Sequence, residues 1–272
     1  MSVSMFRNAV VTGACGGLGQ ALARELISAG ARVALVGLNR PVLEAMVQQN
    51  PEGCVVYQPD VSNVRAMQSV ALDWMGRWGA PDIVIANAGV AGGFDTSRLE
   101  DFAVMRRMLE INLFGVAATF HPFLDAMRAQ GQRTALVGVS SVAGWRGMPG
   151  NGAYCASKAG LTAYLQSLRA EMRSTAVTVH TVSPGYLRTP LTAGNRFAMP
   201  GLMEPDDAAR RLLRAVARGR EHIVLPRRIG WLVRSLNLLP ARLHDQILLG
   251  QPRKPRSGDV GATPIPGLTD SD

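Results

Sequence analysis

The sequence is poor in cysteine and in aromatic residues, and it lacks a long apolar run. Its three cysteines, Cys15, Cys54 and Cys155, are scattered and odd in number, which argues against a disulfide framework and favours a reducing compartment. No stretch reaches the ~20 apolar residues of a membrane-spanning helix. The first residues carry neither a long apolar core nor a small-residue cleavage site, so we expect no signal peptide and a cytoplasmic location.

Metal-ligand patterns and concentrated charge are missing as well. No group of His, Cys, Asp or Glu residues has the spacing of metal ligands, and we therefore predict no metal. The 29 Lys and Arg residues exceed the 20 Asp and Glu residues, which gives a net charge of +9. The arginines are spread through helical stretches such as residues 210–220 without interleaved aromatic residues, so we expect no specific binding of nucleic acid.

Apolar runs and helical patterns alternate along the chain. Runs rich in Val, Ile, Leu and Ala predict strands buried on both faces, at residues 8–11, 32–36, 54–58, 82–86, 134–140, 177–182 and 222–225. Helical patterns separate them, at residues 18–29, 41–49, 63–78, 99–129, 152–174 and 205–219. This alternation predicts an α/β fold, a Rossmann-type doubly wound parallel sheet of about seven strands, as a single domain over residues 1–226.

The chain changes character after this domain. Residues 227–250 carry apolar residues at helical spacing, interrupted by Pro240 and flanked by four arginines, and they predict a C-terminal helical extension. We favour a helical hairpin that packs on the domain, closes a pocket or pairs subunits; the alternative is peripheral contact with a membrane surface. Residues 251–272 are rich in Pro, Gly and small polar residues, and we expect a disordered tail.

A glycine-rich loop joins the first strand to the first helix, in VVTGACGGLGQAL (residues 10–22). Gly13, Gly17 and Gly19 allow a sharp turn and a close approach of the backbone to a ligand. The helix that follows offers unpaired N–H groups and a positive dipole end to a pyrophosphate. In this position the loop predicts a dinucleotide site.

The stretch YCASK places Tyr154 and Lys158 one helical turn apart on the same face. A neighbouring lysine cation favours the phenolate, so we expect it to lower the pKa of the tyrosine and to suit it for proton exchange with an alcohol or carbonyl oxygen. A surface Tyr–Lys pair would give the same spacing without any chemistry.

Further motifs follow in a fixed order: QPDVSN with Asp60, IANAG (residues 85–89) with Asn87, INLFG with Asn112, VSSVAG with Ser141, then YCASK and SPGYLRTP (residues 183–190). Together with the TGxxxGxG loop, this set resembles the short-chain dehydrogenase/reductase family over about residues 6–226. Taken singly, Asp60 and Thr189 are also typical of turn or helix-cap residues, and Asn87 of a residue that ties strands together.

The resemblance implies a catalytic role for Asn112, Ser141, Tyr154 and Lys158. Tyr154 is then the general acid in carbonyl reduction and the general base in alcohol oxidation. Lys158 lowers its pKa and binds the nicotinamide ribose, Ser141 donates a hydrogen bond to the substrate oxygen, and Asn112 holds a water that relays protons. The implied reaction is NAD(P)-dependent hydride transfer to or from a small-molecule substrate, by a homodimer or homotetramer that pairs through the helices at residues 99–129 and 152–174.

The choice between NAD and NADP depends on the end of the second strand. A carboxylate there binds the ribose hydroxyls of NAD and repels the 2′-phosphate of NADP. Family members of the NAD type carry it where this chain has Gly37, and neither Leu38 nor Gly16 supplies the basic residue typical of the NADP type. Because the repulsive carboxylate is missing and Arg40 lies near, we favour NADP over NAD.

The expected site residues form two sets. The cofactor-binding set is Gly13, Gly17, Leu18, Gly19, Asn39, Arg40, Asp60, Val61, Asn87, Ala88, Gly89, Tyr154, Lys158, Pro184, Gly185 and Thr189. The substrate-binding set is Ser141, Trp145, Tyr154 and Tyr186. Apolar residues dominate the expected pocket wall, which favours an apolar alcohol, ketone or aldehyde; its members are Val90, Phe94, Val142, Trp145, Met148, Tyr186, Leu191, Phe197 and Met199.

Two other functions fit parts of the sequence. A serine hydrolase on a similar sheet needs a G-x-S-x-G turn, and GVSSVAG lacks the second glycine at the right place. A dinucleotide-binding protein without catalysis would keep the fold, but it would have no need of the full set of Asn, Ser, Tyr and Lys.

Overall fold

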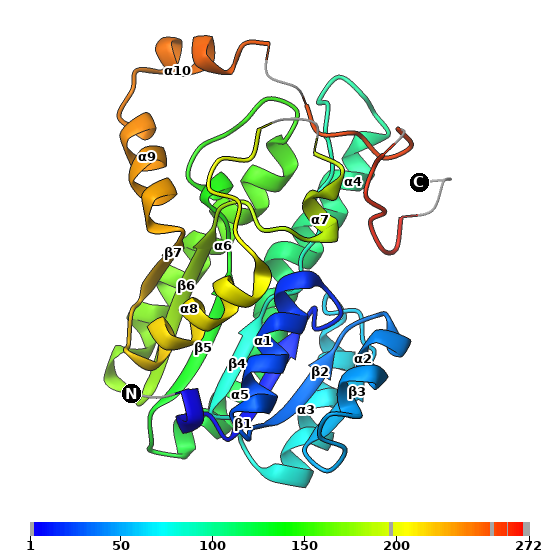
Figure 1. The fold of residues 1–272 in the computed structure, drawn as a ribbon, viewed down its shortest axis with the longest axis vertical. Coiled ribbons are helices and arrows are strands. Elements are labelled where there is room, and N and C mark those ends of the chain that lie inside the picture. Colours follow the sequence, from blue (N-terminus) through cyan, green and yellow to red (C-terminus); the bar gives the residue numbers. More distant parts are fainter. Residues whose placement is uncertain (1–2, 196–197, 251–252, 260, 269–272) are drawn as a thin grey trace.

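A computed structural model of the chain describes residues 3–195, 198–250, 253–259 and 261–268, and Figure 1 shows its fold. Within these residues, seven parallel strands form one sheet, as predicted. In spatial order they are β3 (Cys54–Tyr57), β2 (Arg32–Val36), β1 (Asn8–Thr12), β4 (Ile83–Ala86), β5 (Thr134–Val139), β6 (Val177–Pro184) and β7 (His222–Leu225).

Helices cover both faces of the sheet because successive side chains of each strand point to opposite sides. In β1, Ala9 and Val11 pack with α1 (Gly17–Ser28), α2 (Arg40–Val47) and α8 (Pro205–Ala217). Val10 packs on the other face, with α3 (Val64–Trp78), α5 (Gly115–Ala129) and α6 (Gly152–Glu171). The near-continuous apolar character of the strands therefore reflects two cores rather than one.

The strand order fixes where a ligand can bind. The chain runs outward from β1 to β2 and β3, then returns to the other side of β1 with β4 and continues to β7. In such a sheet the connections diverge between β1 and β4, and a crevice opens beyond the carboxyl ends of these strands.

The long helix expected at residues 99–129 is interrupted. α4 (Asp101–Leu109) is followed by a π-helical turn, Glu110–Phe114, and then by α5. The chain is helical throughout Asp101–Ala129, as predicted, but the π-helical turn was not predicted because a single wider turn barely changes the apolar periodicity of about 3.6 residues. Asn112 lies on this turn, and such turns are frequent at functional sites.

The extension forms the two expected helices, α9 (Arg227–Asn237) and α10 (Ala241–Leu248). α9 packs beside β7, where Gly230 leaves room: a Cβ at this position would lie 2.6 Å from Cγ1 of Val224. Figure 1 shows α10 crossing the top of the molecule, away from the sheet. None of the helices in the described part of the chain is long and apolar enough to span a membrane.

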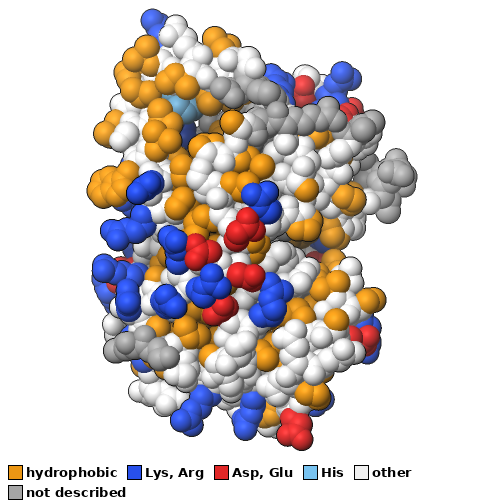
Figure 2. Space-filling view, viewed as in Figure 1, with side chains coloured by type: hydrophobic (Ala, Val, Ile, Leu, Met, Phe, Trp, Pro, Cys, Tyr) orange, Lys and Arg blue, Asp and Glu red, His pale blue; other side chains and the backbone are white. Residues whose placement is uncertain are grey.

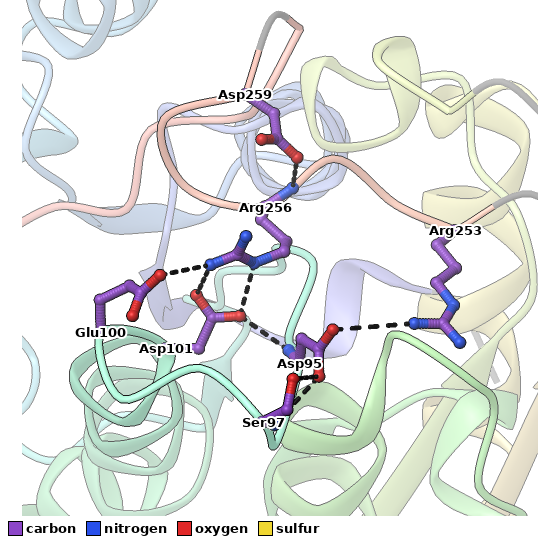
Figure 3. A network of polar contacts seen from close by, with 7 residues as sticks. All are labelled: Asp95, Ser97, Glu100, Asp101, Arg253, Arg256 and Asp259. Atoms are coloured by element: carbon purple, nitrogen blue, oxygen red, sulfur yellow. Dashed lines mark hydrogen bonds and ion pairs between the residues drawn. The ribbon is translucent and has the colours of Figure 1, made fainter.

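Residues 253–259 and 261–268 of the tail are described by the structure and contact the catalytic domain, while the expectation of a disordered tail stays a prediction. Arg256 forms ion pairs with the buried Asp101 and with Glu100, as Figure 3 shows. Ile265 is 6% exposed in an apolar cluster with Phe94 and Met108. The composition of the tail is polar on average, but these few anchors attach it to the domain, and composition does not reveal them.

Backbone pairing adds to these anchors. The amide of Gly93 donates to the carbonyl of Pro255 at 2.9 Å. A Cβ at Gly93 would lie 2.3 Å from the carbonyl oxygen of Lys254 and 2.9 Å from the amide nitrogen of Arg256. The tail therefore approaches the chain after β4 as closely as only a glycine permits.

Replacing this glycine should release the tail. In Gly93→Ala the new methyl group overlaps the tail backbone, so we expect trypsin to cut after Arg256 at least about tenfold faster than in the wild type. Gly76→Ala is the matched control, because a Cβ at Gly76 has no neighbour within 4 Å among the described residues. Equal cleavage rates in the two variants would show that the tail does not pack against Gly93.

Candidate active site

The glycine loop packs against the segment that follows β4. Gly13 has a φ of 64°, which favours glycine, and a Cβ there would lie 2.8 Å from Cα of Ala88. A Cβ at Gly19 would lie 2.0 Å from the carbonyl oxygen of Gly13, so this residue shapes the loop from behind. Within the described residues, no side chain caps α1 and no acid lies in its first turn. The unpaired backbone N–H groups at the start of α1 and the glycine backbone of the loop therefore fit a pyrophosphate.

Asn87 and Thr12 hold the ends of β4 and β1 together. The side-chain amide of Asn87 donates to the carbonyls of Thr12 and Gly13, at 3.1 and 3.3 Å. The hydroxyl of Thr12 accepts from the amides of Asn87 and Ala88, at 3.1 and 3.2 Å. Asn87 thus ties the strands together and also lines the cleft beyond them.

A cleft of about 480 Å³ opens beyond the carboxyl ends of the central strands. Most of the expected cofactor-binding residues line it: Gly13, Gly17, Leu18, Asn39, Asp60, Val61, Asn87, Ala88, Gly89, Tyr154, Lys158, Pro184, Gly185 and Thr189. Ser141 lines it as well. The residues present therefore fit a bound dinucleotide.

Arg40 does not line the cleft. Its guanidinium pairs with Glu44 one turn along α2 and faces outward. The guanidinium also donates to the side chain of Gln58 at 3.5 Å, and the sequence position of Arg40 alone could not reveal these partners. Asn39 lines the cleft with its backbone region, while its side chain accepts from the amide of Val42 at 3.3 Å and caps α2.

Arg107, which sequence reasoning missed, is the partner of Asp60. Its guanidinium pairs with Asp60 and Glu110, and it donates to the hydroxyl of Ser62 at 2.9 Å. Burial alone would raise the pKa of Asp60, but hydrogen bonds from Ser62 and Arg107 hold it below its usual value. Asp60 is therefore an ionised turn residue. It also lines the part of the cleft where we expect the adenosine of a dinucleotide. An arginine in the last turn of a helix gives no signal of this contact.

Ser141, Tyr154 and Lys158 meet at one end of the cleft. Ser141 follows β5, and its hydroxyl accepts from the amide of Ala143 at 3.1 Å, donates to the carbonyl of Pro184 at 3.4 Å and lies beside Tyr154 in the cleft. Nζ of Lys158 lies 5.9 Å from the ring centre of Tyr154 and donates to the carbonyl of Val139 at 2.8 Å. The neighbouring Ser140 instead donates to the carbonyl of Lys158, a structural contact.

Burial shifts both titrating groups toward their neutral forms. It raises the pKa of Tyr154 to about 12, although the neighbouring Ser141 hydroxyl lowers it, and it lowers the pKa of Lys158 to about 8. The sequence predicts that Lys158 lowers the pKa of Tyr154. In this structure desolvation outweighs that effect, because the amine faces the carbonyl of Val139 rather than the phenol oxygen.

Asn112 lies directly behind the cleft and is fully buried. Its side chain exchanges two hydrogen bonds with the backbone of Val90, at 2.8 and 2.9 Å, and donates to the hydroxyl of Ser157 at 3.0 Å. A Cβ at Gly89 would lie 3.2 Å from Oδ1 of Asn112 and 3.3 Å from Nζ of Lys158. The bare Gly89 backbone is thus what lets these two side chains come close.

The expected substrate-binding residues are only partly brought together. Ser141 and Tyr154 line the cleft, but Trp145 and Tyr186 are not among its lining residues. Trp145 packs edge-on against His222, with ring centres 5.6 Å apart, and lies 5.3 Å from the guanidinium of Arg234. These partners on β7 and α9 turn the indole away from the cleft. Of the apolar wall, Val90 and Leu191 line the cleft, and Phe197 lies outside the described residues.

The tail forms part of the cleft wall, which sequence reasoning also missed. Thr263, Pro264 and Pro266 line the cleft, and Arg107 donates to the carbonyl of Pro266 at 2.7 Å. The amine of Lys254 donates to the carbonyl of Leu191 at 3.0 Å, on the opposite side. Among the residues with a described position, no group of three His, Cys, Asp or Glu side chains could hold a metal ion, and the absence of a metal stays a prediction.

Removing the buried amine should remove a pH dependence of folding. The folded-state pKa of Lys158 is about 8 and the ordinary value is 10.5, so the unfolded chain binds more protons between these pH values. The free energy of unfolding of the wild type should therefore rise relative to that of Lys158→Met as pH increases through this range, by at most about 1.4 kcal/mol per pH unit. Urea unfolding at several pH values measures the difference. Parallel curves for the two proteins would show that the amine keeps an ordinary pKa.

Comparison with known proteins agrees with this geometry. Residues 7–199 match the short chain dehydrogenase family. An uncharacterized oxidoreductase of Myxococcus xanthus is 37% identical over 248 residues, which cover 90% of this chain and 97% of that protein. Dehydrogenase/reductase SDR family member 7B of Rattus norvegicus is 31% identical over 282 residues, which cover 94% of this chain and 85% of that protein.

Solved structures share the fold. A short chain dehydrogenase/reductase from Burkholderia phymatum in complex with NAD has a TM-score of 0.76 at 24% identity, over 91% of this chain and 96% of its own. An alcohol dehydrogenase from Thermococcus sibiricus complexed with 5-hydroxy-NADP has a TM-score of 0.70 at 24% identity, over 80% of this chain and 95% of its own. The glycine loop, the Ser–Tyr–Lys cluster and the family match lead to one conclusion: the chain belongs to the short-chain dehydrogenase/reductase family of NAD(P)-dependent oxidoreductases.

Proposed function

We propose that the protein is an NADP-dependent oxidoreductase that acts on an apolar alcohol, ketone or aldehyde, with Asn112, Ser141, Tyr154 and Lys158 as its catalytic residues. The observation that carries the proposal is that Ser141, Tyr154 and Lys158 line the dinucleotide cleft together, with the Lys158 amine 5.9 Å from the ring centre of Tyr154. A carbonyl or alcohol oxygen bound between the two hydroxyls meets a hydrogen-bond donor and a proton source at once.

Each side chain then has a distinct task. Ser141 donates a hydrogen bond to the substrate oxygen, where negative charge grows during reduction. Tyr154 transfers its phenol proton to the same oxygen, and its raised pKa keeps that proton in place near neutral pH. Lys158, with a pKa near 8, can restore the proton and bind ribose hydroxyls. The nicotinamide, when bound, supplies or accepts the hydride.

Asn112 acts at the back of this arrangement. Its side chain fixes the backbone of Val90 and approaches the Lys158 amine across Gly89. We assign it the task of placing a water on the path between Lys158 and solvent, as the family resemblance implies.

The preference for NADP rests on Gly37 and Cys15. Gly37, Leu38 and Asn39 line the cleft after β2, and none of them carries a negative charge. A Cβ at Gly37 would lie 2.9 Å from Sγ of Cys15, so a carboxylate side chain does not fit here unless Cys15 moves. The group that would repel a 2′-phosphate is therefore excluded by packing as well as by sequence.

The surroundings of Tyr154 favour an apolar substrate. Tyr154 packs against a cluster formed by Phe94, Val104, Met108, Ala153 and Ile265. The cleft itself is lined by apolar side chains such as Val90, Leu187 and Leu191, and such a lining binds a hydrocarbon group more readily than a sugar phosphate. A hydrolase is disfavoured, because no histidine in the described part of the chain forms a hydrogen bond with Ser141.

Association through the helices at residues 99–129 and 152–174 remains our proposal for the oligomer. Leu99, Phe102 and Phe114 are 85%, 49% and 51% exposed along this side of the molecule. Exposed apolar residues of this kind suit a second copy of the chain, as a homodimer or homotetramer. A cytoplasmic location stays a prediction from the three free cysteines.

Removing the phenol oxygen tests the catalytic assignment. We expect Tyr154→Phe to lower kcat for apolar ketones by about 100-fold to 10,000-fold, because the proton source is lost. The dissociation constant for the cofactor, measured by nicotinamide fluorescence, should change less than about twofold. Loss of cofactor binding together with activity would give the hydroxyl a structural role. Unchanged turnover would contradict the mechanism, and a wild type that binds cofactor but reduces no carbonyl would favour a non-catalytic binding protein.

Fluorescence titration with NADPH and NADH tests the cofactor assignment. We expect tighter binding of NADPH, and a reversal of at least about tenfold in the double variant Gly37→Asp/Cys15→Ala, which adds the carboxylate and makes room for it. Arg40→Gln is the control, since Arg40 pairs with Glu44 outside the cleft and its loss should leave the ratio unchanged. Tighter binding of NADH by the wild type would overturn the preference.

A further inference from the structure

A second concave surface, which shares no lining residue with the active-site cleft, lies between α8, β7 and α9. It is a groove of about 510 Å³, lined by Arg211, Arg214, Arg218, Arg220, Arg227 and Arg234 together with His222 and Trp231. No acidic residue belongs to the described lining of this arginine groove. Figure 2 shows basic side chains gathered at the left of the molecule, at the level of these elements.

The charges of the arginine groove are largely unpaired. Among the described residues, Arg211 pairs with Asp207 at 2.8 Å, but Arg214, Arg218, Arg220 and Arg227 form no ion pair. Arg234 is held by aromatic rings, 5.3 Å from the centre of Trp145 and 5.8 Å from that of Trp231. Burial and then the charges of Arg234 and Arg169 lower the pKa of His222, as expected beside concentrated positive charge. A groove of this kind attracts anions.

An apolar surface adjoins the groove on α9 and α10. Trp231, Leu232, Leu238, Leu243, Ile247 and Leu249 are 50% to 86% exposed, and they make up half of the large apolar side chains that are exposed in the described chain. Within α10 only His244 is buried. Trp231 belongs to both surfaces, because it lines the groove and is 66% exposed. Figure 2 shows apolar side chains over the same upper part of the molecule.

The apolar surface is fixed to the catalytic domain. Arg146, in the loop after β5, donates to the carbonyls of Leu236, Asn237 and Leu239 at 3.1 to 3.2 Å. The side-chain amide of Asn237 donates back to the carbonyl of Trp145 at 3.3 Å. The end of α9 is therefore held in place, and the apolar surface keeps a fixed position relative to the arginine groove.

We propose that the arginine groove and the exposed face of α9 and α10 together dock on the surface of an anionic phospholipid bilayer. The arginines would bind headgroup phosphates, and the exposed Trp and Leu side chains would enter the interfacial layer. Apolar residues flanked by arginines are typical of helices that lie in the plane of such a surface. The docking is independent of the hydride chemistry, so it can be tested without turnover.

A second copy of the chain is a poorer occupant. In a twofold interface each patch meets its own counterpart, so the unpaired arginines of two copies would face each other and repel. The exposed apolar residues Leu99, Phe102 and Phe114 offer a self-association surface without this cost. Charge complementarity therefore favours a negatively charged surface, rather than a second copy of the chain, as the partner of the arginine groove.

Co-sedimentation of the full chain with vesicles tests the proposal. We expect binding to vesicles of equal parts phosphatidylglycerol and phosphatidylcholine, reversed by high salt, and little binding to phosphatidylcholine alone. Arg214→Gln/Arg218→Gln should weaken binding about 25-fold, at about fivefold for each arginine. Trp231→Ala/Leu238→Ala should weaken it by at least about tenfold.

Matched control variants distinguish the effect of this surface on vesicle binding from effects of net charge and of misfolding. Arg65→Gln and Leu72→Gln change exposed residues of α3, and they should bind vesicles as the wild type does. All variants should keep the wild-type affinity for NADPH, which shows that they are folded. A failure of the proposed function would appear in that cofactor titration, whereas a failure of docking would appear only with vesicles.

Several results would overturn the docking. One is equal binding to both kinds of vesicle, and another is no binding to either. Binding of glycerol phosphate or inorganic phosphate at the groove, without co-sedimentation, would make it a site for soluble anions. Loss of the oligomer in Trp231→Ala/Leu238→Ala, seen by light scattering, would make the face a subunit interface. Tighter binding to RNA than to vesicles would identify a nucleic-acid surface.

Discussion

The buried ammonium group of Lys158 is the constraint around which the site is built. The residue is only 4% exposed, and a charge removed from water is costly unless polar groups surround it. The carbonyl of Val139 supplies one such group at 2.8 Å. Two glycines allow the chain to come close: a Cβ at Gly89 would lie 3.3 Å from the amine, and one at Gly144 would lie 2.7 Å from the carbonyl carbon of Lys158. The segments after β4 and β5 are thus both positioned against one residue of α6.

The same burial shifts the pKa values of Tyr154 and Lys158 in opposite directions. Desolvation raises the pKa of Tyr154 and lowers that of Lys158, so the phenol holds its proton while the amine can release one near neutral pH. The two pKa values therefore lie further apart, at about 12 and about 8, than their ordinary values of 10.0 and 10.5, so transfer of a proton from the Lys158 ammonium to a Tyr154 phenolate is favourable. The apolar cluster beside Tyr154 maintains this environment, and Ile265 of the tail belongs to that cluster.

The fold and the core of the site could be predicted because they depend on local signals. Continuous apolar runs mark strands such as β5, whose residues are buried on both faces of the sheet. Motif residues such as Asn87 and Ser141 follow directly after strands, and a parallel sheet brings those ends to one edge. Features that depend on distant partners could not be predicted. Arg40 pairs with Glu44 outside the cleft, and His222 and Arg234 turn Trp145 toward β7.

The tail shows the order in which the site is completed. Arg256, Ile265 and Pro266 are synthesised after β7, the last strand of the sheet, whose final residue is Leu225. The sheet, the glycine loop and the Ser–Tyr–Lys cluster can therefore form while the cleft is still open along the side that the tail will cover. The outer wall of the dinucleotide pocket is thus the last part of it to be synthesised, and the pairing of Arg256 with Asp101 joins residues that are 155 positions apart.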